Sequence, residues 1–421
     1  MSSARAGNER VDRYARHNLI DWFSQPQLAA SKVAVVGAGA IGNEVVKNLA
    51  LLGVGRVDVF DFDQVELHNL TRSVLLREAD VGQAKAQAVA RRAAELDPNC
   101  IIQAIAGDIR DTLSPESTSQ YTVVIGAVDN FEARLRLNQL CLLAGVDLIN
   151  SAIDSRFVSV ETYPHSRWDV ACYECHLPES AYQRVAQRYS CGGLRKIAFR
   201  ENKVATTVIT ASIAGAMAAA AALRLGEHAA ATAATAATSG TLRASSTAAK
   251  RVFCDTHTMV SQVSNLSRQH SCACCGGFVR RPEMAPVLAE WRVELQRCAG
   301  SETAFVALPE PIIVACSCLH CGSRGDGESE SGSEAKTNKV VLIGQRARDY
   351  DDRLSWCARC KKPSVNIEIR DRFTPAEFLS LYADSTPPLF YALLNDGIRQ
   401  SCINLRRQAE LRPIQKQAEK H

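Results

Sequence analysis

Apolar runs alternate with stretches of helical periodicity over the first 130 residues of the chain. Residues 32–36 form a short apolar run that ends at a glycine, which predicts a buried strand. Apolar residues then recur at helical spacing from Ile41 to Leu52, and Gly53 is placed to end that helix. A second apolar run over 57–60 predicts another strand. Strand, helix and strand in this order are typical of a parallel α/β unit.

The alternation continues with a predicted helix over 83–96 and predicted strands over 100–105 and 122–127. We therefore predict an α/β fold built on a doubly wound, Rossmann-like sheet. Near the C-terminus a strand is predicted over 364–369, and a helix over 375–382 with Thr374 as its cap. A chain of 421 residues has room for a second domain.

Three segments depart from this alternation. Residues 206–225 have the length of a membrane span, but their many alanines and threonines, with Arg224, favour a buried helix. Residues 227–250 consist of Ala, Thr and Ser repeats, and 322–336 are rich in Gly, Ser and Glu. Both compositions predict flexible insertions.

Composition narrows the class of protein. The net charge of +4 gives no case for nucleic acid or an acidic membrane as the main partner. Residues 1–16 lack the apolar core of a secretory signal, which predicts a cytoplasmic protein. Disulfides rarely persist in the cytosol, so the 16 cysteines predict thiolates that bind metal or react.

A glycine turn follows the first predicted strand. Gly37, Gly39 and Gly42 form G-x-G-x-x-G, which lets backbone amides and a helix N-terminus approach a phosphate. Asp61, about twenty residues further on, can bond a ribose hydroxyl. This motif alone fits a nicotinamide or flavin enzyme as well as an ATP-dependent one.

Charged residues beyond the turn favour a triphosphate. Arg72, Lys85 and Asp129 follow predicted strands, so two cations and a carboxylate gather at the carboxyl edge of the sheet. A triphosphate and its magnesium ion need such a set, whereas a dinucleotide does not.

These stretches resemble the ubiquitin-activating superfamily, whose small bacterial members are the ThiF and MoeB adenylyltransferases. The matching motifs are the glycine turn, D-F-D-x-V-x-x-x-N-x-x-R, G-x-x-K and D-N-F-x-x-R, and the resemblance covers roughly residues 10 to 275. It implies a ThiF-type adenylation domain in which Asp61 holds the ATP ribose and Asn69, Arg72 and Lys85 hold the phosphates. It also implies that Asp129 binds Mg²⁺.

The resemblance implies a reaction and an assembly as well. A carrier protein's C-terminal carboxylate attacks the α-phosphorus of ATP, pyrophosphate leaves, and an acyl adenylate forms. Arg16 matches an arginine that reaches across a homodimer to the partner's ATP, although His17 replaces the family's usual glutamine.

Two cysteine pairs have the spacing of a zinc site. Cys172 and Cys175 form one pair, Cys272 and Cys275 the other, and each can present two thiols to one tetrahedral Zn²⁺. The resemblance supports a structural zinc held by two such pairs. Cys274 is an extra thiol inside the second pair, so Cys272 with Cys275 is the preferred assignment.

Cys191 lies in the predicted crossover region, 176–205. The resemblance implies that a cysteine in this region takes the acyl group from AMP in thioester-forming members. Arg188, Arg195 and Lys196 would favour its thiolate. The alternative is a structural cysteine, as we expect for Cys100 and Cys141 in their apolar runs.

The region beyond residue 280 predicts a smaller α+β domain with a zinc ribbon. A second zinc is expected at Cys318, Cys321, Cys357 and Cys360, with Cys316 as a spare thiol. By analogy with larger superfamily members, this domain would recruit a conjugating enzyme. The predicted divisions are an N-terminal helical arm, 1–30, the adenylation domain, 31–280, and the C-terminal domain, 281–421.

The leading interpretation is a ubiquitin-like-protein activating enzyme that forms a thioester and passes its cargo to a conjugating enzyme. The alternative is a sulfur-carrier adenylyltransferase of the thiamine or molybdopterin type, which has no thioester step. A non-catalytic relative would lack some ATP ligands, which are all present here, and a nicotinamide oxidoreductase would rest on the glycine turn alone.

Overall fold

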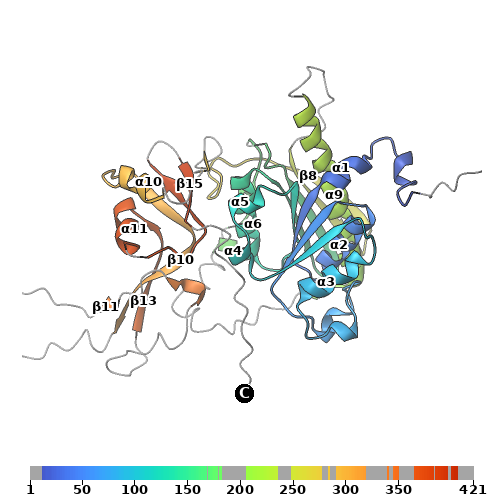
Figure 1. Ribbon diagram of the computed structural model, residues 1–421, viewed down its shortest axis with the longest axis horizontal. Coiled ribbons are helices and arrows are strands. Elements are labelled where there is room, and N and C mark those ends of the chain that lie inside the picture. Colours follow the sequence, from blue (N-terminus) through green and yellow to red (C-terminus); the bar gives the residue numbers. More distant parts are fainter. Residues whose placement is uncertain are drawn as a thin grey trace, which may run out of the picture.

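The computed structural model describes residues 12–167, 169–178, 180–182, 205–235, 248–276, 283–284, 291–318, 339–340, 345–349, 365–383, 385–396 and 400–405. These residues form two sheets, one on each side of the molecule in Figure 1. The larger sheet comes from the N-terminal two thirds of the chain, and the smaller one from the C-terminal third.

The larger sheet has eight strands in the order β3-β2-β1-β4-β5-β6-β7-β8. The first five are parallel: β1 (Lys32–Val36), β2 (Arg56–Asp61), β3 (Ile101–Ala106), β4 (Val123–Gly126) and β5 (Asp147–Ile153). The last three are antiparallel: β6 (Phe157–Tyr163), β7 (Ala249–Asp255) and β8 (Val260–Leu266). The chain runs outward from β1 to β3 and then restarts at β4 on the other side. This reversal confirms the predicted doubly wound sheet and places a topological switch point between β1 and β4.

Helices cover both faces of this sheet (Figure 1). One apolar core forms beneath α2 (Ala40–Leu51), α3 (Lys85–Ala94) and α9 (Val208–Thr235), with α1 (Gln25–Ala30) beside α9. The core of the opposite face lies beneath α4 (Ile109–Thr112), α5 (Pro115–Thr118) and α6 (Phe131–Ala144). Short 3-10 turns occur at η1 (His17–Leu19), η2 (Leu67–Asn69), η3 (Glu78–Asp80) and η4 (Tyr173–His176).

Helix α9 corrects the prediction of a flexible insertion from residue 227, because the helix continues to Thr235. Alanine has the highest helix propensity, so an alanine-rich segment that continues a packed helix extends it despite lacking apolar periodicity. Residues 236–247 lie outside the described residues. Within α9, Val208–Leu225 is long and apolar enough to span a membrane by composition alone. It packs instead on α2, β5 and β6, as predicted for a domain helix.

The C-terminal sheet has seven strands, with β11-β10-β14-β15-β9 as its main path and β12 and β13 also paired with β10. The strands are β9 (Glu283–Met284), β10 (Phe305–Cys318), β11 (Lys339–Val340), β12 (Gln345–Arg346), β13 (Val365–Phe373), β14 (Tyr391–Asn395) and β15 (Gln400–Asn404). The 3-10 turn η6 (Ala347–Asp349) follows β12, and α10 (Trp291–Cys298) packs beside α11 (Pro375–Leu381) over this sheet's own apolar core. The predicted cap is confirmed, since Thr374 Oγ1 accepts a hydrogen bond from the Glu377 amide at 3.2 Å.

The two sheets meet across α6. Tyr391 of β14 is fully buried and accepts a hydrogen bond from Arg136 at 2.5 Å, while its hydroxyl donates to Gln139 at 2.7 Å. Phe390 and Cys402 join the apolar cluster beneath α6. The C-terminal sheet therefore packs on the face of the larger sheet that α4, α5 and α6 cover.

Candidate nucleotide site and cysteine cluster

The glycine turn between β1 and α2 is shaped by contacts that exclude side chains. Gly37 has φ +97°, and a Cβ there would lie 2.5 Å from the Ala127 carbonyl oxygen. A Cβ on Gly42 would lie 1.8 Å from the Gly37 carbonyl oxygen. Gly39 differs, because a Cβ there would meet nothing within 4 Å. The turn therefore leaves open space at Gly39, beside a helix N-terminus that has no side-chain cap.

Asp61 ends β2 next to this turn. One carboxylate oxygen accepts the Ala38 amide at 2.7 Å, and the other accepts the Asp63 amide at 2.8 Å. Burial raises the pKa of Asp61 above its ordinary value, while the Lys85 charge and these two amides oppose that rise. The carboxylate is thus rigidly held at the carboxyl edge of the sheet, at the predicted ribose position.

Asn43 supports the turn and was not recognised in the sequence. Its buried side chain donates to the carbonyls of Ala38 and Gly39, at 2.7 and 3.0 Å, and accepts the Leu75 amide at 3.0 Å. It therefore joins the glycine turn to the loop that follows η2. A buried asparagine one residue after a glycine motif carries no sequence signal beyond its polarity.

Lys85 is buried at the first position of α3. A cation at a helix N-terminus opposes the helix dipole, so this placement costs stability. The ammonium group bonds Asp63 at 3.0 Å and lowers the pKa of Asp61 through its charge. Lys85 and Asp61 therefore lie together at this edge of the sheet.

Asn69 and Arg72 lie on the turn around η2. The Asn69 side chain accepts the Glu66 amide at 3.0 Å, and the Arg72 guanidinium donates to the His68 carbonyl at 2.8 Å. Both side chains thus bond within their own loop, and their predicted contacts with phosphate stay a prediction. The His68 ring nitrogen lies 2.9 Å from a Glu66 carboxylate oxygen in the same loop.

Asp129 is exposed just after β4, on the other side of the switch point. Asn130 caps α6 by accepting the Ala133 amide at 2.8 Å. Arg134, one turn into α6, donates to the Val128 carbonyl and to the Asn150 side chain. The Asn150 amide in turn donates to buried Glu161 at 2.8 Å. Arg134, the arginine that ends the D-N-F-x-x-R motif, therefore fixes the loop that carries Asp129.

Gly39, just before α2, and Gly42, in its first turn, give different expectations on substitution. Gly42→Ala should lower the free energy of unfolding by about 3 kcal/mol, because its methyl group would clash with backbone. Gly39→Ala should change stability by less than about 0.5 kcal/mol, since φ is −74° and the space is open. Its methyl group would nevertheless occupy the space of a bound phosphate. Thermal melting and ATP titration of both variants test this, and Gly39→Ala with wild-type affinity for ATP would contradict the assignment.

Arg16 lies away from this set. Tyr14, two residues earlier, packs on Gly53 and bonds Asp97 at 2.5 Å, and His17 contacts Gln25 at 3.0 Å. Gly53 precedes β2, so these contacts hold the arm at the amino end of the sheet. The exposed Arg16 side chain is therefore not brought to its own chain's carboxyl edge.

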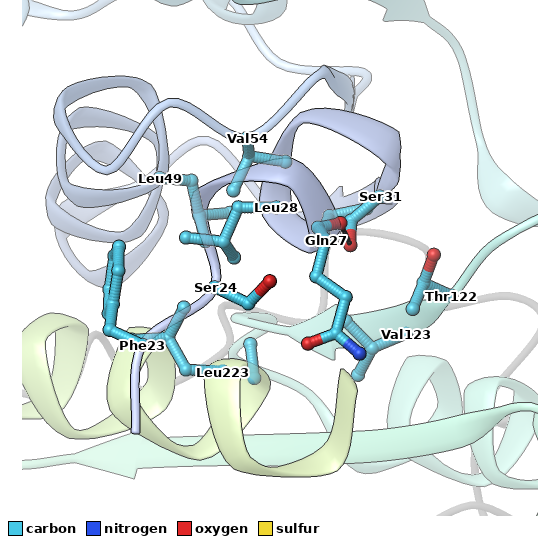
Figure 2. Close-up of a pocket in the computed structure, with 12 residues that line it drawn as sticks. Phe23, Ser24, Gln27, Leu28, Ser31, Leu49, Val54, Thr122, Val123 and Leu223 are labelled. Atoms are coloured by element: carbon cyan, nitrogen blue, oxygen red, sulfur yellow. Dashed lines mark hydrogen bonds between the residues drawn. The ribbon is translucent and has the colours of Figure 1, made fainter. Parts of the chain in front are cut away.

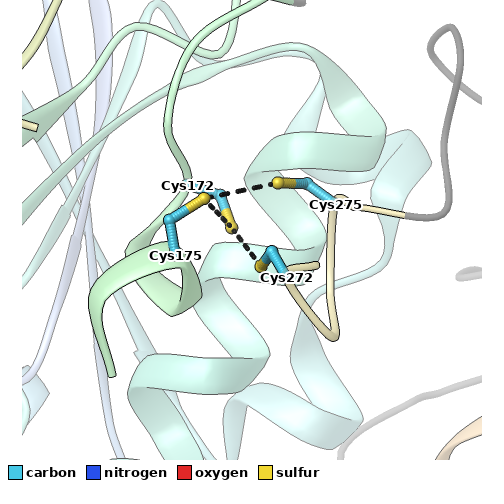
Figure 3. A group of neighbouring side chains, drawn as sticks. All are labelled: Cys172, Cys175, Cys272 and Cys275. Carbon is cyan, nitrogen blue, oxygen red and sulfur yellow. Dashed lines mark hydrogen bonds between the residues drawn. The ribbon is translucent and has the colours of Figure 1, made fainter. Parts of the chain in front are cut away.

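Cys172, Cys175, Cys272 and Cys275 form one cluster beside α6 (Figure 3). Their sulfur atoms all lie within 4.8 Å of one another, and three of the separations are 3.6, 3.9 and 3.5 Å. A tetrahedral Zn²⁺ with bonds of about 2.3 Å requires sulfur separations of about 3.8 Å. The four thiols therefore fit a structural zinc, as the spacing predicted.

Cys274 stays outside the four-sulfur group. Its sulfur accepts a hydrogen bond from the Asn138 side chain at 3.4 Å, and Asn138 also bonds Glu174 at 3.0 Å. The preferred pairing of Cys272 with Cys275 agrees with this geometry. Burial raises the pKa of Cys100 to about 12 and that of Cys141 higher still, as expected for cysteines of the core.

Several predicted residues lie outside the described ones. Cys191, with the basic residues around it, falls in 183–204. Of the second zinc set, Cys321, Cys357 and Cys360 are outside as well, and only the backbone of Cys318 is described, at the end of β10.

A small apolar pocket of about 30 Å³ lies beneath α1 (Figure 2). Phe23 and Leu28 from the arm, Leu49 from α2, Val123 from β4 and Leu223 from α9 line it. Val123 begins β4, so the pocket opens at the amino end of the sheet, opposite the glycine turn. It is a gap in the packing of the arm and lies apart from the nucleotide site.

A switch point with a glycine turn, a half-buried acid and a buried lysine beside it, and four clustered cysteines define a Rossmann-like nucleotide-binding protein with a buried four-cysteine cluster. The chain belongs to the ThiF family, whose sequence pattern matches residues 12–274. This confirms the resemblance identified from the motifs.

Curated relatives cover part of the chain. The SAMP-activating enzyme E1 of Haloferax volcanii is 34% identical over 174 residues, 41% of this chain and 63% of that protein. The sulfur carrier protein adenylyltransferase of Thermus thermophilus is 34% identical over 178 residues, 41% of this chain and 65% of that protein. The adenylyltransferase and sulfurtransferase MOCS3-1 of Zea mays is 31% identical over 189 residues, 44% of this chain and 40% of that protein. The chain thus spans less than two thirds of each relative.

Among solved structures, MccB of E. coli with succinimide aligns with a TM-score of 0.50. The alignment covers 64% of this chain and 75% of MccB at 24% identity. At that identity the likeness bears on the fold alone, and it supports the arrangement of the larger sheet.

Proposed function

We propose that this chain uses ATP to adenylate the C-terminal carboxylate of a ubiquitin-like or sulfur-carrier protein. The observation that carries the proposal is the convergence of the open glycine turn, Asp61 and Lys85 at one switch point in a ThiF-family chain. The relatives' printed activities support it, since they include an activating enzyme and adenylyltransferases.

Each group has a defined task in this reaction. The α2 N-terminus, Asn69, Arg72 and Lys85 would hold the phosphates, and Asp61 the ribose. Asp129 would hold Mg²⁺, which supplies positive charge next to the departing pyrophosphate. The carrier's carboxylate oxygen bonds to the α-phosphorus as the bond to the β-phosphate oxygen breaks. Because the substrate brings its own nucleophile, this step requires no protein nucleophile.

The finer steps belong to the same proposal. The Cys191 thiolate would attack the acyl carbon, forming a thioester and releasing AMP, and a conjugating enzyme would then take the acyl group. Arg16 would reach a second chain's nucleotide in a homodimer, which is consistent with its distance from its own chain's site. The second cysteine set would hold another zinc, so zinc analysis should give two ions per chain. The setting proposed for these steps is the cytoplasm.

The test is ATP–pyrophosphate exchange with carriers that end in Gly-Gly, each compared with a version lacking the two glycines. Exchange only with the intact carrier is the expected result, and no exchange with any carrier would overturn the proposal. Non-reducing gels of wild type, Cys191→Ala and Cys298→Ala follow the thioester, with Cys298 as a partly exposed control on α10. An adduct lost only in Cys191→Ala supports the activating enzyme, whereas exchange without an adduct supports the sulfur-carrier adenylyltransferase.

A further inference from the structure

The groups that would bind the parts of the nucleotide lie side by side along the carboxyl edge of the larger sheet. The glycine turn follows β1, Asp61 ends β2, and β3 is the next strand outward. Phosphates at the turn and ribose at Asp61 would direct the base toward the end of β3. The segment after β3 is therefore the part of the fold that would lie against the base.

This segment is bonded to both sides of the site. The Gly107 amide donates to the Asp61 carbonyl at 3.3 Å, and Asp108 caps α4 by accepting the Arg110 amide at 2.8 Å. The Arg110 side chain bonds both Asp108 oxygens, at 3.0 and 2.5 Å, and also pairs with Glu132. Glu132 lies in the first turn of α6, three residues after Asp129, so Arg110 joins the segment after β3 to the start of α6.

Two arginines of the C-terminal sheet hold the same segment. Arg348 donates to Asp108 at 3.3 Å and to Asp111 at 2.7 Å, and Arg346 also bonds Asp111. Arg348 pairs in addition with Glu310 of β10, at 3.0 Å. These side chains come from β12 and η6, more than 200 residues away from α4 in the sequence.

The burial of Arg346, Arg348 and Glu310 distinguishes them from the residues of ordinary surface pairs, although Asp111, the partner of both arginines, is 39% exposed. The Arg346 and Arg348 side chains are 19% and 12% exposed, and that of Glu310 is 8% exposed. Burial alone would raise the pKa of Asp108, but Arg110 and then Arg348 lower it below its ordinary value. The pair that joins Arg370 of β13 to Glu377 of α11 is 36% and 45% exposed, and such pairs contribute little.

The space beside these charges is open. A cleft of about 130 Å³ lies between α4 and the C-terminal sheet, with Arg110, Asp111, Arg346 and Phe390 among its lining residues. Where the C-terminal sheet contacts α4, charged side chains hold this helix next to the cleft. Loss of the arginines would therefore loosen the segment, although Ile109 and Leu113 still anchor it in the apolar core.

We propose that the C-terminal sheet completes the nucleotide site, with Arg346 and Arg348 as positioning residues that hold the segment 107–113 against bound ATP. The inference rests on the proposed function, because it names the part of that same site which the C-terminal sheet controls. Docking of the C-terminal sheet and affinity for ATP are then coupled. Tyr391 holds the sheet on α6 independently of these arginines.

The test uses the full chain with Arg346→Met and Arg348→Met combined. We expect the KM for ATP in pyrophosphate exchange to rise about five- to tenfold with kcat within about twofold, because binding is lost but the reacting groups stay in place. Amides of 107–113 should exchange hydrogen at least about tenfold faster, while those of 391–395 remain protected by the Tyr391 contact. Arg370→Met is the matched control and should leave both readouts unchanged.

Two replacements at one position guard against a variant that is merely misfolded. Arg346→Asp should raise the KM for ATP, whereas Arg346→Lys keeps a positive charge beside Asp111 and Asp349 and should keep the KM close to that of wild type. The inference would be overturned if the double methionine variant kept both the wild-type KM for ATP and the wild-type rate of amide hydrogen exchange at 107–113. A wild type without pyrophosphate exchange would count against the proposed function alone, and hydrogen exchange of 107–113 without ATP would then decide the inference.

Discussion

Replacing Lys85 by methionine should reduce ATP–pyrophosphate exchange at least about 100-fold, because a buried cation aimed at developing charge contributes on that scale. The substitution should leave the melting temperature unchanged or raise it. Lys85 is 7% exposed at the start of α3, where its charge opposes the helix dipole, and methionine fills a similar volume without that charge. Exchange kinetics and thermal melting of the same preparation measure both effects.

The control for Lys85 is Lys32→Met at the opposite end of the sheet. Lys32 begins β1 and pairs with Asp58 at 3.7 Å, so its loss removes a lysine far from the glycine turn. We expect exchange close to wild type from this variant. If Lys85→Met retained the ATP–pyrophosphate exchange of wild type but had a lower melting temperature, Lys85 would be a structural residue. The assignment of the phosphate site would then be wrong.

The second large effect concerns the cysteine cluster. Cys175→Ser should remove one zinc ion per chain relative to wild type and lower the melting temperature by about 10 °C or more. Metal binding by a structural site of four cysteines contributes directly to folding, at about 10–16 kcal/mol in zinc-finger peptides. Elemental analysis after gel filtration and a melting curve measure the two quantities.

Cys274→Ser is the matched variant, because its sulfur bonds Asn138 outside the four-sulfur group. It should keep the zinc content of wild type. A loss of zinc from Cys274→Ser equal to that from Cys175→Ser would show that Cys274 is a ligand.

Local signals in the sequence were sufficient for the first four strands of the larger sheet. The strands β1 to β4 and helices α2 and α3 follow from apolar periodicity, and the cysteine cluster follows from spacing within each pair. These features depend on neighbours in the sequence, which a pattern of residue types records.

What the sequence left unpredicted depends on distant contacts. Only β13 of the C-terminal strands was predicted, because the others are short or interrupted and gain stability from pairing across the sheet. The bonds from Asn43 to Leu75 and from Arg348 to Asp108 have no local signature. Helix α6 was also missed, because its own apolar and polar residues are distributed around the whole helix and form no apolar stripe.

Because α6 makes contacts on several sides, its length limits how the protein can evolve. The loop carrying Asp129 leads into this helix, Asn138 on it bonds the Tyr173 amide and Glu174 beside the cysteine cluster, and Arg136 and Gln139 hold Tyr391. A one-residue insertion would rotate everything beyond it by about 100° and break all these contacts together. A mutational scan should accordingly find α6 the helix least tolerant of insertions, and inherited length variation should gather in the loops around it.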